Sequence, residues 1–229
     1  MTNKTKIGIL MLDTKFPRIL GDIGNPATWN FPVIYKVVKN ASPDAVVLKD
    51  ERQLLQAFVE AGHELVAQGA TGITTTCGFL SIYQSHLSNA LRVPVLTSSL
   101  MQVQLVNALL PKGRYAGILT ISFDSLKSDH LKAAGVPKNT PIGSTEGFSY
   151  FTRTFLNNEP ELNSDLARQE NVQAAKDLQR NHPNLGAFVL ECTNMAPYAR
   201  DISDATNLPV YSIFSLVTWF QSGLIPNPF

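Results

Sequence analysis

The chain has 229 residues and a formal net charge of +1, which suits two modest domains or one large one. The 44% hydrophobic and 16% charged residues are typical of a globular protein, and the scattered charges give no reason to expect nucleic acid or an acidic membrane surface as partner. No apolar run reaches about 18 residues and the N-terminal run is too short for a signal peptide, so we expect no membrane span and a cytoplasmic location.

The first half alternates apolar runs with helical patterns. We predict strands over residues 6–12, 44–49, 72–76 and 93–98. An amphipathic helix covers about 50–68, another follows the third strand to about residue 90, and a third begins at Ser98-Ser99, with Ser99 as its cap. Residues 33–39 are ambiguous. A Gly- and Pro-rich first loop (residues 13–32) follows the first strand, and loops of this length in compact domains are often functional.

The second half repeats the alternation. Its predicted strands are 114–122, 140–146, 185–191 and 208–214. One predicted helix ends at about residue 134, a second covers 164–181, a third begins at about 196, and a last one lies at the C-terminus. The aromatic-rich stretch 147–163 has no clear assignment. Continuous apolar strands that alternate with helices predict parallel sheets covered on both faces.

An internal repeat divides the chain into two copies of one α/β unit. An offset of 115 residues superposes the only two cysteines and several neighbours: Cys77 on Cys192, Tyr83 on Tyr198, Ser88 on Ser203 and Pro94 on Pro209. We therefore predict an α/β fold of two similar lobes related by pseudo-twofold symmetry. The lobes comprise 1–98 plus 213–229, and 99–212, with the active site in the cleft between them.

The cysteines are the leading candidates for chemistry. Each sits at the carboxyl end of a predicted strand, where parallel α/β sheets bind ligands, and at the start of a helix, whose dipole favours the thiolate. We therefore expect at least one of them to react rapidly with iodoacetamide. Other polar residues at strand ends are Asp13, Thr14, Thr76, Ser98, Ser99, Thr120, Ser122, Thr193 and Asn194. No Arg or Lys lies there, so a substrate anion would rest on hydroxyls and backbone N–H groups.

Two cysteines on opposite sides of a cleft suit cofactor-free inversion of a carbon centre. One thiolate removes a proton from one face, and the other thiol returns one to the opposite face. We expect both thiols to be reduced, and no CxxC or HxxxH spacing suggests a metal site. The competing interpretation is that each cysteine is simply a small buried hydrophobe, which is the common fate of a free cysteine.

The chain resembles the Asp/Glu/hydantoin racemase superfamily over nearly its whole length. The resemblance lies in Cys77-Gly78 after an apolar strand, in the run L-x-C-T-N at 190–194, and in Asp13-Thr14 after the first strand. It implies Cys77 and Cys192 as the acid/base pair and no cofactor. It also implies a small substrate bearing a carboxylate or a hydantoin ring, held by Thr76, Gly78, Thr193 and Asn194. From their place at strand ends we add Asp13, Thr14, Thr120 and Ser122 as predicted substrate contacts.

Two departures from the family leave alternatives open. Glu191 stands where the family usually has glycine, and strand alternation suggests that it points away from Cys192. Asn194 replaces the histidine of glutamate racemases. The main interpretation is a racemase of an amino acid or hydantoin. A maleate isomerase-like or arylmalonate decarboxylase-like enzyme, or a non-catalytic two-lobed binding protein, remains an alternative, and homo-oligomerisation is left open.

Overall fold

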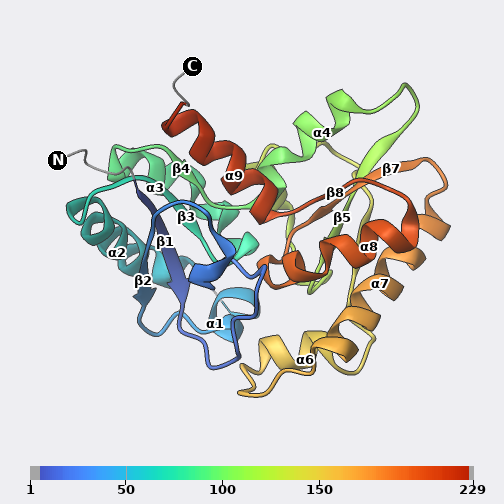
Figure 1. Ribbon diagram of the computed structural model, residues 1–229, viewed down its shortest axis with the longest axis horizontal. Coiled ribbons are helices and arrows are strands. Elements are labelled where there is room, and N and C mark those ends of the chain that lie inside the picture. The colour runs from blue at the N-terminus through green and yellow to red at the C-terminus, as the bar shows by residue number, and fades with distance from the viewer. Residues whose placement is uncertain (1–5, 50, 227–229) are drawn as a thin grey trace.

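The computed structural model describes residues 6–49 and 51–226, and two parallel four-stranded sheets form its framework. Figure 1 shows the sheets in separate halves of the molecule. The first has the order β2-β1-β3-β4, from β1 (Lys6–Leu12), β2 (Val33–Val38), β3 (Ala70–Thr75) and β4 (Val95–Leu96). The second has the order β6-β5-β7-β8, from β5 (Tyr115–Thr120), β6 (Ile142–Ser144), β7 (Leu185–Leu190) and β8 (Val210–Tyr211). The predicted two-lobed α/β architecture is confirmed.

The repeat in the sequence is also a repeat of structure. After β3 come the 3-10 helix η3 (Gly78–Tyr83) and α3 (Gln84–Leu91), and after β7 come η5 (Thr193–Tyr198) and α8 (Ala199–Thr206), all shifted by 115 residues. Both α-helices end on a left-handed residue, Arg92 and Asn207, each with φ of 56°. Residues other than glycine seldom adopt this conformation, so its recurrence at equivalent positions supports a duplicated unit.

Helices cover the sheets on both sides, as buried parallel strands require. In the first lobe α2 (Leu55–Ala67) packs on β1, β2 and β3, and in the second α7 (Ser164–Asn181) packs on β5 and β6. Other helices, besides those described below, are α4 (Val103–Leu109), α5 (Ser128–Ala133), η1 (Pro26–Thr28) and η2 (Glu51–Leu54). None of the helices in the described residues is long and apolar enough to cross a membrane.

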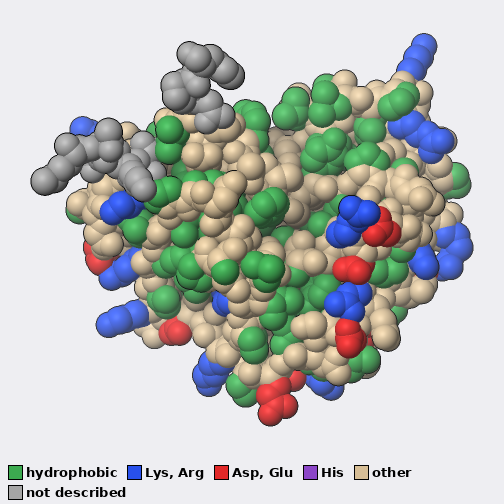
Figure 2. Space-filling model, in the orientation of Figure 1, with side chains coloured by type: hydrophobic (Ala, Val, Ile, Leu, Met, Phe, Trp, Pro, Cys, Tyr) green, Lys and Arg blue, Asp and Glu red, His purple; other side chains and the backbone are tan. Residues whose placement is uncertain are grey.

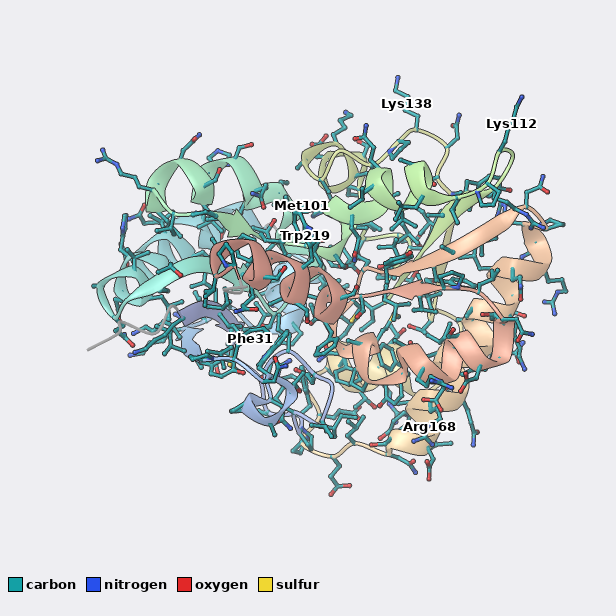
Figure 3. The ribbon with its side chains drawn as sticks, turned by 45° about the horizontal axis from the view of Figure 1, so that its top comes forward. Phe31, Met101, Lys112, Lys138, Arg168 and Trp219 are labelled. Carbon is teal, nitrogen blue, oxygen red and sulfur yellow. The ribbon has the colours of Figure 1, made fainter. Side chains whose placement is uncertain are left out.

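The last helix, α9 (Ile213–Leu224), touches both sheets, through β3 and β8. Its buried side chains include Ile213 and Val217, whereas Trp219 is 63% exposed on its outer side (Figure 3). On the face of the molecule seen in Figure 2, charged side chains of both signs are scattered, in keeping with the even charge pattern of the sequence. The lobe boundaries given above stay a prediction.

One predicted strand is a helix. Residues 44–49 were expected to be extended, but α1 (Pro43–Val47) is helical. Pro43 at the first helical position and Asp44 in the first turn are helix-start features, and they outweigh the short apolar run, whose periodicity alone cannot separate helix from strand. The second strand of the lobe is instead β2, in the segment that the sequence left ambiguous.

The hydrogen bond from Thr193 Oγ1 to the Thr76 carbonyl joins the two lobes, and hydrogen bonds of Ser98 and Ser99 hold the junction in the chain between them. Ser98, not Ser99, caps the 3-10 helix η4 (Ser99–Gln102), because the Ser98 hydroxyl accepts from the N–H of Leu100 at 3.2 Å. The Ser99 hydroxyl instead donates to the carbonyl of Leu190 in β7. The larger of two buried core clusters in the described residues also runs through both lobes and includes both cysteines. The two halves therefore pack as one body around the cleft.

The unassigned stretch 147–163 closes one side of that cleft. It contains α6 (Phe151–Leu156), which packs on α1 of the first lobe (Figure 1). Just beyond it, the Asn158 amide binds the first loop: its Oδ1 accepts from the Lys15 N–H at 2.6 Å and its Nδ2 donates to the Asp13 carbonyl at 3.3 Å. A second-lobe segment and a first-lobe loop thus meet over the site.

Candidate active site

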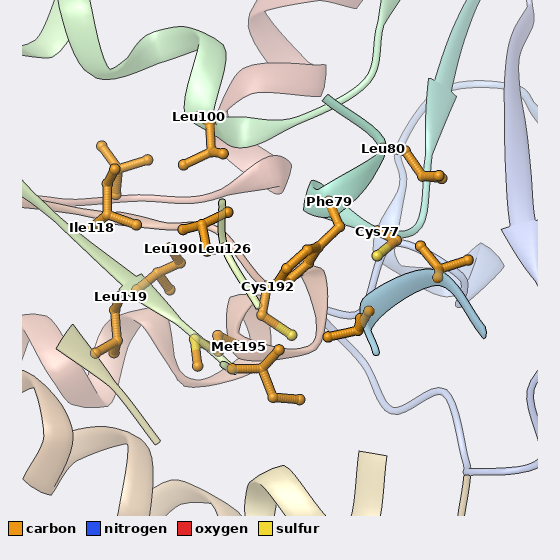
Figure 4. Packing of buried hydrophobic residues seen from close by; sticks show 14 of the residues in the cluster. Cys77, Phe79, Leu80, Leu100, Ile118, Leu119, Leu126, Leu190, Cys192 and Met195 are labelled. Atoms are coloured by element: carbon orange, nitrogen blue, oxygen red, sulfur yellow. The ribbon is translucent and has the colours of Figure 1, made fainter. Parts of the chain in front are cut away.

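The two cysteines end equivalent strands and share one pocket. Cys77 follows β3 and takes the N-cap position of η3, and Cys192 follows β7 and takes the N-cap position of η5. Both thiols are free and buried. Figure 4 shows the two side chains in the buried cluster with Phe79 close by. The repeated unit therefore places one thiol from each lobe in the same pocket.

Both thiols line one pocket, whose cavity volume is about 30 Å³. Most of its wall is apolar. The lining residues are Leu12, Phe16, Arg18, Pro43, Val47, Thr76, Cys77, Gly78, Phe79, Ile121, Phe155, Leu156, Glu191, Cys192, Thr193 and Asn194. They come from both lobes, so the pocket is the cleft that the sequence predicted. Its charged side chains are few, namely Arg18 and Glu191.

Six of the predicted site residues line this pocket, namely Cys77, Cys192, Thr76, Gly78, Thr193 and Asn194. The hydroxyls of the two threonines are already engaged. The amide N–H of Leu12 donates to Thr76 Oγ1 at 3.0 Å, and Thr193 Oγ1 donates to the Thr76 carbonyl at 2.7 Å. These bonds tie β1, β3 and η5 together, so the threonines position the two cysteine-bearing segments relative to each other.

The other four predicted residues, Asp13, Thr14, Thr120 and Ser122, are not among the lining residues. Asp13 is exposed. Thr14 accepts a hydrogen bond from Arg18 at 3.1 Å. Thr120 and Ser122 are buried and donate to the carboxylates of Glu191 and Glu146, at 2.7 and 2.6 Å. Two of these four, Thr14 and Thr120, therefore bond to the lining residues Arg18 and Glu191 instead of lining the pocket themselves.

Arg18 brings a cation into the pocket that strand-end reasoning missed. Its Nη1 forms an ion pair with Asp22 at 3.1 Å, and its Nη2 donates to Thr14. Its Nε is buried and has no hydrogen-bond partner among the described residues. The expectation that no Arg or Lys reaches the site was wrong, because Arg18 arrives from the first loop instead of from a strand end. The signal in the sequence was the i,i+4 Arg–Asp pair inside a long loop.

Asp22 fixes both Arg18 and Asn194. Its Oδ1 accepts from Arg18 and from the N–H of Gly24, and its Oδ2 accepts from Asn194 Nδ2 at 2.7 Å. The Oδ1 of Asn194 then lies 3.8 Å from the Cys192 sulfur, which donates to it. The first loop is thereby coupled to the second-lobe cysteine through a buried, charge-assisted network.

Glu191 also lines the pocket, contrary to the direction that alternation suggested. The residue is completely buried. Its Oε2 accepts from Thr120 Oγ1 at 2.7 Å, and the N–H of Ile121 also bonds to the carboxylate. A Cβ placed on Gly78 would lie 2.2 Å from Glu191 Oε1 and 2.3 Å from the Glu191 carbonyl oxygen, so only glycine fits against this residue.

Burial dominates the acidity of the two thiols. It raises the pKa of Cys77 to about 12 and the pKa of Cys192 well above its usual value, and the nearby Glu191 charge adds to both shifts. The expectation of a lowered thiol pKa in the ligand-free protein was therefore wrong. Backbone N–H groups of η3 and η5 do lower the pKa, but less than desolvation raises it.

This acidity predicts slow alkylation. In the ligand-free protein at neutral pH, we expect iodoacetamide to modify Cys77 and Cys192 more slowly than the same cysteines in the urea-unfolded chain, because the thiolate is the reactive form. Peptide mapping by mass spectrometry at timed intervals gives both rates in one experiment. Faster alkylation in the folded protein would contradict the raised pKa values.

Glu191 predicts a dependence of stability on pH. Burial raises its pKa from 4.5 to about 7, so the folded state binds this proton more tightly than the unfolded chain. The resulting stabilisation is complete below the unfolded pKa and is lost as the pH rises through about 7, amounting to about 3 kcal/mol. Urea unfolding at about pH 5 and about pH 8 should show this loss in the wild type and not in Glu191→Gln. An equal pH dependence in both proteins would contradict it.

Sequence comparison finds similar proteins that are named lyases. No protein-family model matches it. Dimethylsulfoniopropionate lyase 7 of Emiliania huxleyi (strain CCMP1516) is 28% identical over 244 residues, covering 97% of this chain and 68% of that protein. A dimethylsulfoniopropionate lyase of Durusdinium sp. clade D is 28% identical over 233 residues, covering 97% of this chain and 76% of that protein. The likeness therefore includes both lobes.

Solved structures share the fold. Unliganded arylmalonate decarboxylase superposes with a TM-score of 0.60 at 14% identity, covering 98% of this chain and 94% of that one. Glutamate racemase from Francisella tularensis subsp. tularensis SCHU S4 gives 0.60 at 14% identity, with 99% and 85% covered. Allantoin racemase from Pseudomonas fluorescens gives 0.59 at 17% identity, with 96% and 91% covered. The structural neighbours of this chain are thus members of the Asp/Glu/hydantoin racemase superfamily, whose two-lobed fold it shares.

Proposed function

We propose that the protein is an enzyme that removes a proton from the carbon next to a carboxylate, and that it eliminates dimethyl sulfide from dimethylsulfoniopropionate. The observation that carries this proposal is the pair Cys77 and Cys192 in one buried pocket that also contains Arg18. The relatives named dimethylsulfoniopropionate lyase, which match 97% of the chain, support the choice of substrate. The fold, shared with a decarboxylase and with racemases, supports chemistry at a carbon beside a carboxylate.

In the proposed reaction a cysteine thiolate takes a proton from the substrate carbon next to the carboxylate. The electron pair of that C–H bond forms a carbon–carbon double bond with the neighbouring carbon. The bond from this neighbouring carbon to sulfur breaks, and its electron pair leaves on sulfur as neutral dimethyl sulfide. The organic product is acrylate, and the proton on the thiol passes to solvent, so the reaction needs no oxidant, reductant or second substrate.

The lining residues can serve this chemistry. The open Nε of Arg18 can donate to the substrate carboxylate, and its charge stabilises the negative charge that develops there as the proton leaves. The apolar side chains, Phe79 and Phe155 among them, exclude water and strengthen these interactions. A cationic substrate in the pocket would lower the pKa of the two cysteine thiols, because a nearby positive charge favours the thiolate.

A racemase of a small carboxylic acid is the second candidate, and one observation favours it. Elimination needs a single base, whereas inversion needs a proton-transferring group on each face, and here two cysteines line the pocket. This was the main interpretation of the sequence. The names of the curated relatives support elimination better, since a lyase is not a racemase.

Product analysis with purified protein separates the two candidates. We expect dimethyl sulfide in the headspace by gas chromatography and an equal amount of acrylate in solution, above the rate of a protein-free control at the same pH. In parallel, chiral chromatography monitors the L and D forms of aspartate, glutamate and allantoin. Interconversion of enantiomers without dimethyl sulfide release would favour the racemase. The absence of both activities would contradict the proposal.

A further inference from the structure

The carboxylate of Glu191 is half satisfied inside the pocket. Its Oε2 accepts from Thr120 Oγ1, but its Oε1 is buried and has no hydrogen-bond partner among the described residues. A buried carboxylate oxygen without a partner is costly, so its retention calls for an explanation. Because Oε1 lies against the backbone of Gly78, the glycine admits the carboxylate to this position.

No protein cation neutralises Glu191 in the described pocket. Arg18 is the cationic side chain among the lining residues, and it is paired with Asp22, whose oxygens also accept from Gly24 and Asn194. Glu191 is the acidic side chain among those same lining residues. The pocket therefore presents an Arg18 donor from the first lobe and an unneutralised carboxyl group from the second.

We propose that Glu191 is a specificity-determining residue that makes this pocket select small zwitterions, with its open oxygen facing the cationic group of a substrate whose carboxylate is held by Arg18. This inference rests on the proposed function in placing the carboxylate at Arg18. The aromatic rings of Phe79 and Phe155 also line the pocket, and aromatic faces attract cations. A substrate cation completes a site that is otherwise short of one positive charge.

The role of Glu191 differs from that of a group that only stabilises the fold. A structural carboxylate would be satisfied by protein donors at both oxygens, as Asp22 is. In Glu191, Oε2 accepts from Thr120, whereas Oε1 has no hydrogen-bond partner among the described residues, and the residue lines the pocket. Substitution should therefore change which ligand is preferred, whereas a purely structural role would weaken all ligands alike.

Two isosteric ligands test this inference. 3-(Trimethylammonio)propanoate and 4,4-dimethylpentanoate share their shape and their carboxylate and differ only in one positive charge. Neither contains a sulfur leaving group, so calorimetry at about pH 8 reads binding without the proposed reaction. We expect the wild type to bind the cationic ligand at least about tenfold more tightly.

Glu191→Gln should bring the two affinities to within about twofold. Glu161→Gln removes an exposed carboxylate outside the pocket and should keep the preference. Should Glu191→Gln fail to fold, Thr120→Val removes the donor to Oε2 without removing the charge, and should lose part of the preference. Equal affinities in the wild type, or an unchanged preference in the folded variant, would overturn the inference.

The outcome is independent of dimethyl sulfide release. If the cationic preference depends on Glu191 but no dimethyl sulfide forms, the inference stands and the proposed reaction fails. If dimethyl sulfide forms and Glu191→Gln lowers only turnover while keeping the preference, the reaction stands and the inference is overturned.

Discussion

Replacing Cys77 or Cys192 by serine should lower dimethyl sulfide release by about 10²–10⁴-fold in at least one of the two variants, the range expected for loss of a general base. Serine keeps the shape of the side chain but its hydroxyl is a far weaker acid than a thiol, so no comparable base forms. Initial rates of acrylate formation measure the loss. Loss in one variant identifies a single base, and loss in both points to a pair that works together.

The control for this experiment is a change in the same buried wall that leaves both thiols intact. Met195 lies in η5, close to Cys192 in sequence, and is completely buried. Met195→Leu conserves volume and should cost less than about 1.5 kcal/mol of stability while retaining activity. Full activity in both cysteine variants would exclude the thiols as bases.

Arg18 should be the residue with the next largest effect. Arg18→Met removes the donor for the substrate carboxylate and leaves the buried Asp22 without its charged partner. We expect kcat/KM to fall by about 10²-fold, because losing the guanidinium leaves the buried substrate carboxylate without its charged partner, and such a loss costs several kcal/mol. Steady-state kinetics with dimethylsulfoniopropionate measures this loss, and calorimetry with 3-(trimethylammonio)propanoate should show weakened binding as well.

A second variant separates the two roles of Arg18. Asp22→Asn keeps the guanidinium but removes the charge that orients it, so it should lower kcat/KM less than Arg18→Met does. Arg18→Lys keeps the charge and loses the planar fork, and should recover only part of the activity. Unchanged ligand affinity in Arg18→Met would show that Arg18 does not hold the carboxylate.

The sequence predicted the features that depend on pattern. The offset that superposes Cys77 on Cys192 was visible in a few identities, and the structure reproduces it down to the left-handed residues at Arg92 and Asn207. Strand ends in a parallel α/β sheet converge on one edge, so placing both thiols there required only the order of elements. The first loop was also singled out by its length, and the structure places its Arg18 in the pocket lining.

What escaped prediction depends on packing between segments distant in the chain. No sequence pattern near Arg18 predicts that its loop packs against residues of both lobes. Alternation misdirected Glu191, because the strand β7 ends at Leu190 and the next residue no longer follows its pleat. The thiol pKa direction failed for a related reason: a helix start can be read from sequence, but complete burial cannot.

The sequence likewise predicts one step of the proposed reaction and not the other. Removal of a proton beside a carboxylate is common to racemases and to the elimination proposed here, and the spacing of two cysteines reports only that step. Whether a leaving group follows depends on the substrate that the pocket admits. The side chains that would decide this, Arg18 and Glu191, are the two that the cysteine repeat does not mark.

The most direct test of the account uses dimethylsulfoniopropionate with both hydrogens replaced by deuterium on the carbon next to the carboxylate. Removal of one of these by a cysteine, followed by loss of dimethyl sulfide, must give acrylate that retains a single deuterium on that carbon. Mass spectrometry of the product of the purified wild-type protein reads the label directly. Acrylate with one deuterium, absent from the inactive cysteine variant, is the result we predict, whereas 3-hydroxypropanoate retaining both deuteriums, or no turnover, would contradict the account.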